Sequence, residues 1–340
     1  MTELNIKHLI DKRVLVTGGG GFLGKAIINQ LLVYTPHIRS LSRKYYPELE
    51  KLTVQQVQGD IAIADIVDRA CQDQDIVFHV AAKAGFWGPY GEYYQANVTG
   101  TDNIINACVK HKIGYLIYTS TPGVVNGGKE PIEGVDESSP YPDSFPTAYL
   151  ATKALAEQAV MTSASDTLKT ISLRPHLIWG PGENHLVSRI MAWAGKIVRV
   201  GDGKNLVDTV YIDNAAEAHL QAAEAIQKNS ALSGNVYFIS QGEPVYMWDI
   251  INAILKAGDK PPVSRSIPRI PATIIGALLE WVYKSLRLKS EPKLTRYLAH
   301  EFSSAQWFDI SAARRDLGYA PQVSMEEGLK RLTEWMKTCN

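Results

Sequence analysis

Short apolar runs alternate with amphipathic stretches along the first half of the chain. The runs predict buried strands, and after most of them apolar residues recur every three or four positions, as on one face of a helix. Strands that alternate with helices predict a parallel sheet covered on both faces, and right-handed crossovers make such a sheet doubly wound. The expected strands are 13–16, 38–41, 54–57, 75–80, 115–119 and 170–173, and the clearest helices are 97–110 and 148–161.

The pattern loosens after Pro175. Turn signals such as Gly180-Pro181-Gly182 and Gly242-Glu243-Pro244 interrupt shorter apolar segments. We therefore expect an α/β fold in two parts. Residues 1–175 form the doubly wound sheet, and residues 176–340 form a smaller mixed α/β substrate-binding region, from which some elements return to the first sheet.

Residues 271–289 predict a helix with one apolar face and a basic end. The apolar positions are Ile274, Ile275, Leu278, Leu279 and Val282, and the basic ones are Lys284, Arg287 and Lys289. Such a helix fits a substrate lid, a partner-docking helix, a helix on a membrane surface, or simple packing on its own domain. It is too short to span a bilayer.

Charge and cysteine content narrow the classes of protein. The chain has 340 residues, with 35 Lys and Arg against 35 Asp and Glu, and this balance argues against nucleic acid as a partner. Cys71, Cys108 and Cys339 fit neither a zinc site nor a disulfide framework, so no metal is expected and a reducing compartment is favoured. Charged residues near the N-terminus interrupt any signal-like run, and we expect a cytoplasmic protein.

A glycine-rich turn follows the first expected strand. Gly18 permits a tight turn, Gly21 lets the backbone approach a pyrophosphate, and Gly24 allows close helix–strand packing. Phe22 and Leu23 then open a helix whose N-terminus attracts phosphate. The motif predicts a dinucleotide site, and the plainer alternative is a structural turn.

The segment after the second strand favours NADP(H) over NAD(H). Residues 38–44 contain no acidic side chain for a ribose 2′-hydroxyl, whereas Arg43 and Lys44 suit a 2′-phosphate. The alternative is that both are solvated loop charges. Asp60, followed by Ile61, is a candidate contact for the adenine amino group, or a helix N-cap.

Tyr149 and Lys153 lie four residues apart at the start of an expected helix, so they share one face. An ammonium beside a phenol lowers the tyrosine pKa, and such a tyrosine can deliver a proton to a carbonyl oxygen. Lys153 can also hold a nicotinamide ribose. Upstream, the fifth strand ends at Ser120 and Thr121, where a hydroxyl group can bind the same oxygen.

These motifs together resemble the extended short-chain dehydrogenase/reductases, and within them the 3β-hydroxysteroid dehydrogenase branch. The resemblance covers nearly the whole chain and implies a Rossmann-like fold. The matching segments are 17–24, 59–60, 79–82, 97–101, 118–121, 149–153, 173–175, 178–182 and 211–216.

The resemblance also implies roles for single residues. Tyr149 becomes the catalytic acid/base and Lys153 its partner. The catalytic hydroxyl falls on Thr121 where the family usually has serine, and neighbouring Ser120 leaves the register open. The cofactor set further includes Ala81, Ala82 and Lys83 after the fourth strand, and Pro175 and Ile178 beside the nicotinamide.

Four segments, 81–88, 118–122, 173–185 and 201–208, are most similar to family members that act in bacterial long-chain olefin biosynthesis. They imply NADPH-dependent reduction of a lipid-like 2-alkyl-3-oxoalkanoic acid to the 3-hydroxy acid. They also imply assembly with neighbouring enzymes of that pathway. Family members commonly pair through the Tyr–Lys helix, so a homodimer is expected.

Candidate substrate contacts lie next to these motifs. Lys83 follows the fourth strand and is a candidate for a carboxylate or a cofactor phosphate, or else a solvated lysine. Phe86 and Trp87 offer apolar contact to an acyl chain, or pack as core. His176 is a weaker candidate, because a packing histidine is the commoner case.

Two other functions stay open at this point. A 3β-hydroxysteroid or sterol dehydrogenase shares the fold and the Tyr–Lys chemistry. A non-catalytic NADP-binding sensor or assembly subunit would need only the glycine turn, although this chain keeps both Tyr149 and Lys153.

Overall fold

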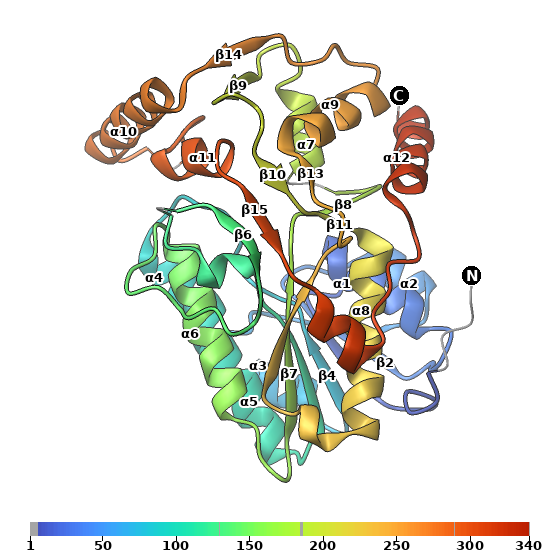
Figure 1. The fold of residues 1–340 in the computed structure, drawn as a ribbon. Helices are drawn as coiled ribbons and strands as arrows, with labels where there is room; N and C mark the ends of the chain where they lie inside the picture. Colours follow the sequence, from blue (N-terminus) through green and yellow to red (C-terminus); the bar gives the residue numbers. More distant parts are fainter. Residues whose placement is uncertain (1–5, 129, 184–185, 289, 340) are drawn as a thin grey trace.

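A parallel sheet of seven strands forms the centre of the computed structural model, which describes residues 6–128, 130–183, 186–288 and 290–339 (Figure 1). The strand order is β12-β7-β5-β4-β1-β2-β3, and each neighbouring pair runs parallel. The strands are β1 (Val14–Thr17), β2 (Ile38–Ser42), β3 (Gln55–Gln58), β4 (Ile76–His79), β5 (Tyr115–Thr119), β7 (Lys169–Pro175) and β12 (Asn235–Ile239).

Helices cover both faces of this sheet, which confirms the doubly wound α/β fold. α1 and α8 pack together on one face, and α3, α5 and α6 cover the other, so a separate apolar core lies on each side. The bounds are α1 (Phe22–Leu31), α2 (Pro47–Lys51), α3 (Ala64–Cys71), α4 (Tyr90–Tyr93), α5 (Gly100–Lys110), α6 (Ala148–Thr162) and α8 (Ile212–Lys228).

The strands could be predicted from the sequence because they are buried. β1 and β4 are buried at every position, and such strands read as unbroken apolar runs. The six expected strands all occur, with ends that differ by up to two residues. The expected helix 97–110 begins as a π-helical turn, η1 (Tyr94–Thr99), and continues as α5.

Smaller sheets and helices form the upper part of the molecule (Figure 1). One sheet has the order β13-β10-β15-β6, and two pairs are β11-β8 and β14-β9. The strands are β6 (Ile132–Val135), β8 (Ile178–Trp179), β9 (Val198–Val200), β10 (Leu206–Val207), β11 (Val210–Tyr211), β13 (Val245–Tyr246), β14 (Arg265–Ile267) and β15 (Gln306–Phe308). The helices are α7 (Leu186–Ala192), α9 (Met247–Ala257), α10 (Arg269–Ser285), α11 (Arg296–Glu301) and α12 (Met325–Cys339). Three short turns lie outside this part: η2 (Pro122–Val125) packs against α6, and η3 (Ser230–Leu232) and η4 (Ala313–Leu317) pack against α8.

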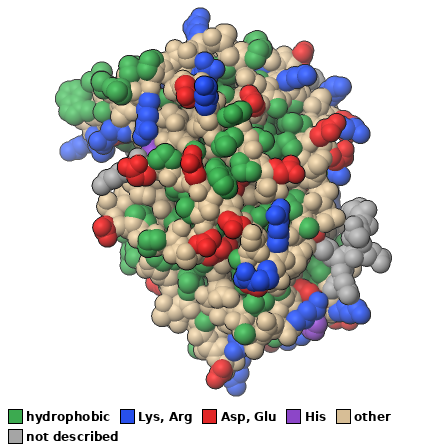
Figure 2. All heavy atoms as spheres, in the orientation of Figure 1, with side chains coloured by type: hydrophobic (Ala, Val, Ile, Leu, Met, Phe, Trp, Pro, Cys, Tyr) green, Lys and Arg blue, Asp and Glu red, His purple; other side chains and the backbone are tan. Residues whose placement is uncertain are grey.

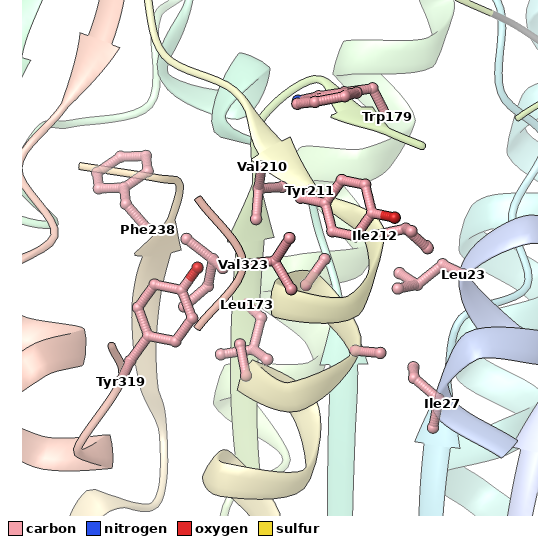
Figure 3. Close-up of a cluster of buried hydrophobic side chains, with 14 of the residues drawn as sticks. Leu23, Ile27, Leu173, Trp179, Val210, Tyr211, Ile212, Phe238, Tyr319 and Val323 are labelled. Carbon is pink, nitrogen blue, oxygen red and sulfur yellow. The ribbon is translucent and has the colours of Figure 1, made fainter. Parts of the chain in front are cut away.

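A cluster of aromatic and aliphatic side chains joins the two parts (Figure 3). The Trp179 and Tyr211 rings meet edge to face at 5.3 Å between centroids, and Leu23 of α1 belongs to the same core. Gly328 of α12 allows the close approach, because a Cβ there would lie 2.7 Å from the Tyr211 ring and 2.8 Å from that of Trp179.

The chain passes repeatedly between the two parts. β6 comes from the first half but pairs with β15, and β12 comes from the second half but extends the large sheet beside β7. The division at residue 175 therefore stays a prediction. The expected helix 271–289 is observed as α10, which ends at Ser285, and Lys289 lies outside the described residues. In the described part of the chain, no helix has the length and hydropathy needed to cross a membrane.

Candidate active site

The turn between β1 and α1 is built from contacts that only glycine permits. Gly18 has a φ of 71°, and a Cβ there would lie 3.1 Å from the backbone of Ala81. A Cβ on Gly24 would lie 2.2 Å from the Gly18 carbonyl oxygen. These two glycines thus let α1 and the end of β4 close in on the turn.

Gly21 differs, because a Cβ there would meet one atom, the Gly18 oxygen at 3.1 Å. Gly21 is exposed at the N-cap of α1, no side chain caps this helix, and its first turn carries no acidic residue. Phe22 begins the helix and Leu23 anchors it in the core. An uncapped, uncrowded helix N-terminus fits the pyrophosphate of a dinucleotide.

Two basic side chains stand beside this turn. Arg43 and Lys44 directly follow β2, are exposed, and form no ion pair with any residue that the structure describes. Ser42, the last residue of β2, accepts a hydrogen bond from the Gly20 amide at 3.3 Å, which ties the two loops together. Both cations are therefore available to a phosphate group near the turn.

Asp60 and Ile61 follow β3. The Asp60 carboxylate accepts a hydrogen bond from the Ala62 amide at 2.9 Å and so caps the turn before α3. The N-cap of α3 itself is Ile63, so Asp60 does not hold that position. Ile61 is buried, and its side chain would clash with a Cβ on Gly100.

The end of β4 lies against the glycine turn. The Thr17 hydroxyl oxygen accepts hydrogen bonds from the amides of Val80 and Ala81 at 3.1 and 3.0 Å. Ala82 and Lys83 follow, and the Asn97 side chain brackets the Lys83 backbone at its N–H and C=O groups. The loop after β4 is thus fixed from both sides.

The Tyr149 hydroxyl is placed by a helix cap and a neighbouring hydroxyl. The Thr147 side chain accepts a hydrogen bond from the Leu150 amide at 3.3 Å and starts α6. Burial raises the pKa of Tyr149 to about 12, and a hydrogen bond with the Thr121 hydroxyl opposes this rise. Tyr149 is therefore protonated at neutral pH and can donate a proton.

Lys153 lies one helical turn later and is buried. Its ammonium donates hydrogen bonds to the Tyr118 hydroxyl at 2.6 Å and to the Thr119 carbonyl at 2.7 Å, and it lies 4.1 Å from the centre of the Tyr118 ring. Burial lowers the pKa of Lys153 to about 7, although nearby Glu157 acts to raise it. The ammonium thus faces β5 rather than the Tyr149 phenol.

Of the two hydroxyls at the end of β5, the structure brings Thr121 to Tyr149. Thr121 also caps η2 by accepting a hydrogen bond from the Gly123 amide. Ser120 is held by its backbone, whose amide donates to the Leu173 carbonyl at 2.6 Å. The Ser120 hydroxyl is buried without a hydrogen-bond partner in the described structure.

Pro175 ends β7, and Ile178 begins the short strand β8 that pairs with β11. Between them, the His176 ring binds the Asp208 carboxylate at 2.6 Å and stacks edge to face on Phe308 at 5.2 Å between centroids. His176 is buried in this contact and is not part of the cavity described next.

A cavity of about 1150 Å³ lies between the loop after β4 and the helices α10 and α11. Three of the expected substrate residues, Lys83, Phe86 and Trp87, line it. The Phe86 ring lies 6.0 Å from that of Tyr149 and 4.8 Å from that of Tyr297, so Phe86 lies between the cavity and Tyr149, which is not itself part of the lining.

Positive charge exceeds negative charge in this cavity. The Lys83 ammonium pairs with Glu92 at 2.8 Å, and Arg296 pairs with Glu280 at 2.8 Å. The remaining cations of the lining are Arg269, Lys284 and Arg287. Within the described residues none of them has a carboxylate partner, so the cavity suits an anion.

Sequence reasoning missed the residues that α11 contributes. Tyr297 and His300 lie three residues apart on α11, so both reach the cavity. Glu301, whose pKa is raised by burial, accepts hydrogen bonds from Asn126 and Gln306 behind them. The Thr295 side chain caps α11, so the start of this helix can be recognised in the sequence. No sequence pattern indicates that α11 lies near Tyr149.

Comparison with known proteins identifies the family of this chain. The 3-beta hydroxysteroid dehydrogenase/isomerase family matches residues 15–269. The 2-alkyl-3-oxoalkanoate reductase of Stenotrophomonas maltophilia (strain K279a) is 48% identical over 94% of this chain and 98% of its own length. A decarboxylating sterol-4-alpha-carboxylate 3-dehydrogenase of Schizosaccharomyces pombe is 36% identical over 94% of this chain and 96% of its own.

The fold also matches solved structures. The UDP-glucuronic acid 4-epimerase from Bacillus cereus, solved in complex with NAD, superposes with a TM-score of 0.74 at 23% identity, over 96% of this chain and 99% of that one. At this identity the likeness speaks for the fold alone. The family match and the two relatives together show that this chain belongs to the 3-beta hydroxysteroid dehydrogenase/isomerase family, within the extended short-chain dehydrogenase/reductases.

Proposed function

We propose that this protein is an NADP(H)-dependent oxidoreductase that reduces a 2-alkyl-3-oxoalkanoic acid to the 2-alkyl-3-hydroxyalkanoic acid. The observation that carries the proposal is the cavity near Tyr149, which combines aromatic walls with three cations that have no carboxylate partner among the described residues. Aromatic walls suit alkyl chains, and unpaired cations suit a carboxylate. The reductase that is 48% identical to this chain is named for such an acid.

The dinucleotide would be held by the glycine turn and the loops around it. Gly18, Gly21 and the start of α1 suit the pyrophosphate, whereas Arg43 and Lys44 suit a 2′-phosphate and so favour NADP(H). When bound, the reduced cofactor supplies the hydride. Asp60, Ile61, Ala81, Ala82, Pro175 and Ile178 stay predicted cofactor contacts.

Tyr149 is the proposed proton donor. Its raised pKa keeps the phenol protonated, so that it can protonate the carbonyl oxygen as that oxygen gains negative charge. Thr121 hydrogen-bonds the phenol, and we assign its hydroxyl the role of orienting the phenol and binding the substrate oxygen. A protonated donor at neutral pH favours the reductive direction.

Both classes of named relative act on the same functional group. In a sterol-4-carboxylate, the oxygen-bearing carbon 3 is adjacent to the carbon that carries the carboxyl group, as in a 2-alkyl-3-oxo acid. Both substrates therefore carry a carboxyl group on the carbon next to the reacting carbon. A sterol carboxylate is our second candidate substrate, and the basic side chains after β2 disfavour its oxidation with NAD.

The test is NADPH formation by the purified protein with NADP⁺ and a 2-alkyl-3-hydroxyalkanoic acid. The reaction is run in this direction because the 3-oxo acid decarboxylates. A 3β-hydroxysteroid-4-carboxylate and NAD⁺ are assayed in parallel. Turnover of the acyclic acid with NADP⁺ is expected, and turnover of the steroid alone would replace the proposal by the second candidate.

Variants separate catalysis from cofactor binding. Tyr149→Phe and Thr121→Ala should each lower kcat by about 10²- to 10⁴-fold while NADPH binding, followed by fluorescence, is retained. Ser120→Ala is the matched control and should keep most activity, since its hydroxyl does not meet Tyr149. Full activity of Tyr149→Phe would overturn Tyr149 as the proton donor, whereas a wild type that binds NADPH but turns over neither acid would favour the non-catalytic sensor.

The quaternary and cellular predictions stand beside this proposal. We expect a homodimer, a cytoplasmic location and assembly with other enzymes that make long-chain olefins, as the resemblance implies. Size-exclusion chromatography with light scattering tests the dimer directly.

A further inference from the structure

Helix α10 packs through one face only. Ala272, Gly276 and Glu280, spaced four residues apart, are its buried positions, and α10 packs against α11. A Cβ on Gly276 would lie 2.6 Å from the Thr295 carbonyl carbon, so the two helices touch at the backbone. This contact fixes which face of α10 points outward.

The outward face is apolar. It lies on the side of the helix opposite the buried positions, about 160° round the axis at 100° per residue. Ile270, Ile274, Leu278 and Trp281 are exposed by 73%, 63%, 60% and 66%, and we call these four residues the α10 face. Exposed apolar side chains gathered on one helix mark an interaction surface.

The charge around the α10 face is positive. Lys284 and Arg287 are exposed at the C-terminal end, and Arg269 begins the helix. The acidic residue of α10, Glu280, is buried and paired with Arg296. Figure 2 shows green and blue side chains gathered at the upper left, where Figure 1 places α10.

We propose that the α10 face docks on an anionic lipid bilayer, with its apolar side chains between the headgroups and with Lys284 and Arg287 at the phosphates. Helices that lie in a bilayer surface combine an apolar face, tryptophan and flanking cations in this way. A second copy of the chain is a poorer occupant, because two such faces would bring like charges together. An anionic bilayer satisfies both the apolar side chains and the cations.

One side of α10 also forms part of the cavity wall. Thr273, Tyr283 and Lys284 are part of the cavity wall, so the cavity lies beside the docked surface. This step rests on the proposed function, since an acid with two long alkyl chains partitions into a bilayer. The protein would then collect its substrate from the membrane.

The experiment is flotation of the full-length protein, without substrate, on two kinds of vesicle. One is pure phosphatidylcholine, and the other contains phosphatidylcholine and phosphatidylglycerol in equal amounts. The wild type should bind the anionic vesicles, and Ile274→Glu with Leu278→Glu should weaken this binding about tenfold or more. Ile270→Glu with Trp281→Glu should give the same loss, and Val33→Glu, at a position 78% exposed elsewhere, is the control.

Each result decides the proposal. Failure of the wild type to bind, equal binding to both vesicles, or binding that survives both double variants would overturn it. Self-association abolished by the double variants, without vesicle binding, would assign the α10 face to a second copy instead. Circular dichroism and NADPH binding verify that the variants fold. Because flotation needs no turnover, its failure leaves the proposed reaction standing, and a failed activity assay leaves the docking test intact.

Discussion

The charge on Lys153 is set by two opposing surroundings. Burial disfavours the ammonium and lowers its pKa, whereas the nearby Glu157 carboxylate acts to raise it. The balance puts the pKa near 7, so the side chain changes charge within the working range of an enzyme.

Lys153→Met should change how stability depends on pH. Between pH 7 and 10.5 the unfolded lysine holds a proton that the folded one has released, so the free energy of unfolding rises with pH. Removing the lysine should flatten this rise by about 1 kcal/mol per pH unit. Urea denaturation of both proteins between pH 7 and 9 measures the difference.

Tyr149→Phe is the matched control for that measurement. The phenol keeps its proton in both states between pH 7 and 9, because burial raises its folded pKa to about 12 from 10.0. The slope of this variant should equal that of the wild type. Equal slopes for Lys153→Met and the wild type would contradict the buried, weakly basic lysine.

Much of the site was visible in the sequence because its motifs are short-range. The Tyr149–Lys153 spacing and the glycine turn depend on neighbours within one strand–turn–helix unit. The contact of Lys153 with Tyr118 was not predictable, because it depends on the path of a flexible side chain. Tyr297 reaches Tyr149 through Phe86 from a helix almost 150 residues later, and no local pattern encodes that distance.

At the scale of elements, α12 is held by a contact between a glycine and two aromatic rings. Gly328 is buried against Trp179 and Tyr211, at the seam between the large sheet and the upper part. Helix propensity alone favours alanine over glycine by about 1 kcal/mol. At position 328 the two rings leave too little space for a Cβ atom, and this reverses the preference for alanine.

Gly328→Ala should lower the free energy of unfolding by about 1 kcal/mol, because overpacking of about 1–3 kcal/mol outweighs the gain in helix propensity. Thermal unfolding followed by circular dichroism measures this. Gly91→Ala is the control, since a Cβ on Gly91 meets no atom within 4 Å. A Gly328→Ala protein as stable as the control would show that the rings move aside at no cost.

Elements with a strong local pattern were predicted well, and those defined by partners were not. β1 and β4 are wholly buried and read as strands in isolation. β12 is also mostly apolar, but a local pattern cannot show that it pairs with β7. That pairing depends on α8, which crosses the sheet before β12 begins. Strands of two residues, such as β8 and β11, exist because they pair and have no periodicity of their own.

For the whole molecule, a net charge of zero hides an uneven distribution. In the part of the chain that the structure describes, Arg269, Lys284 and Arg287 line the cavity without carboxylate partners, although Lys plus Arg equals Asp plus Glu over the chain. The overall composition argued against a nucleic-acid partner, but it could not reveal a local cationic pocket. The pocket arises only when α10 meets the loop after β4.

If the substrate carboxylate binds these cations, added salt should weaken its binding in the cavity. Exposed charges are screened over about 10 Å at 0.1 M ionic strength. With saturating cofactor, the KM for the carboxylic acid should rise about threefold or more from low to high salt, with little change in kcat. The methyl ester of the same acid should show no such rise, and an equal rise for the ester would refute the role of the three cations.

The crossing of β6 and β12 between the two parts also bears on how the chain is synthesised. The ribosome releases β1 to β7 well before α8 and β12, so the face of the nascent sheet that α1 and α8 share lacks α8 until residue 228 has emerged. Its apolar surface is meanwhile open to chaperones or to aggregation. Neither half made alone has a complete core, and splitting the gene at residue 175 should yield two insoluble fragments.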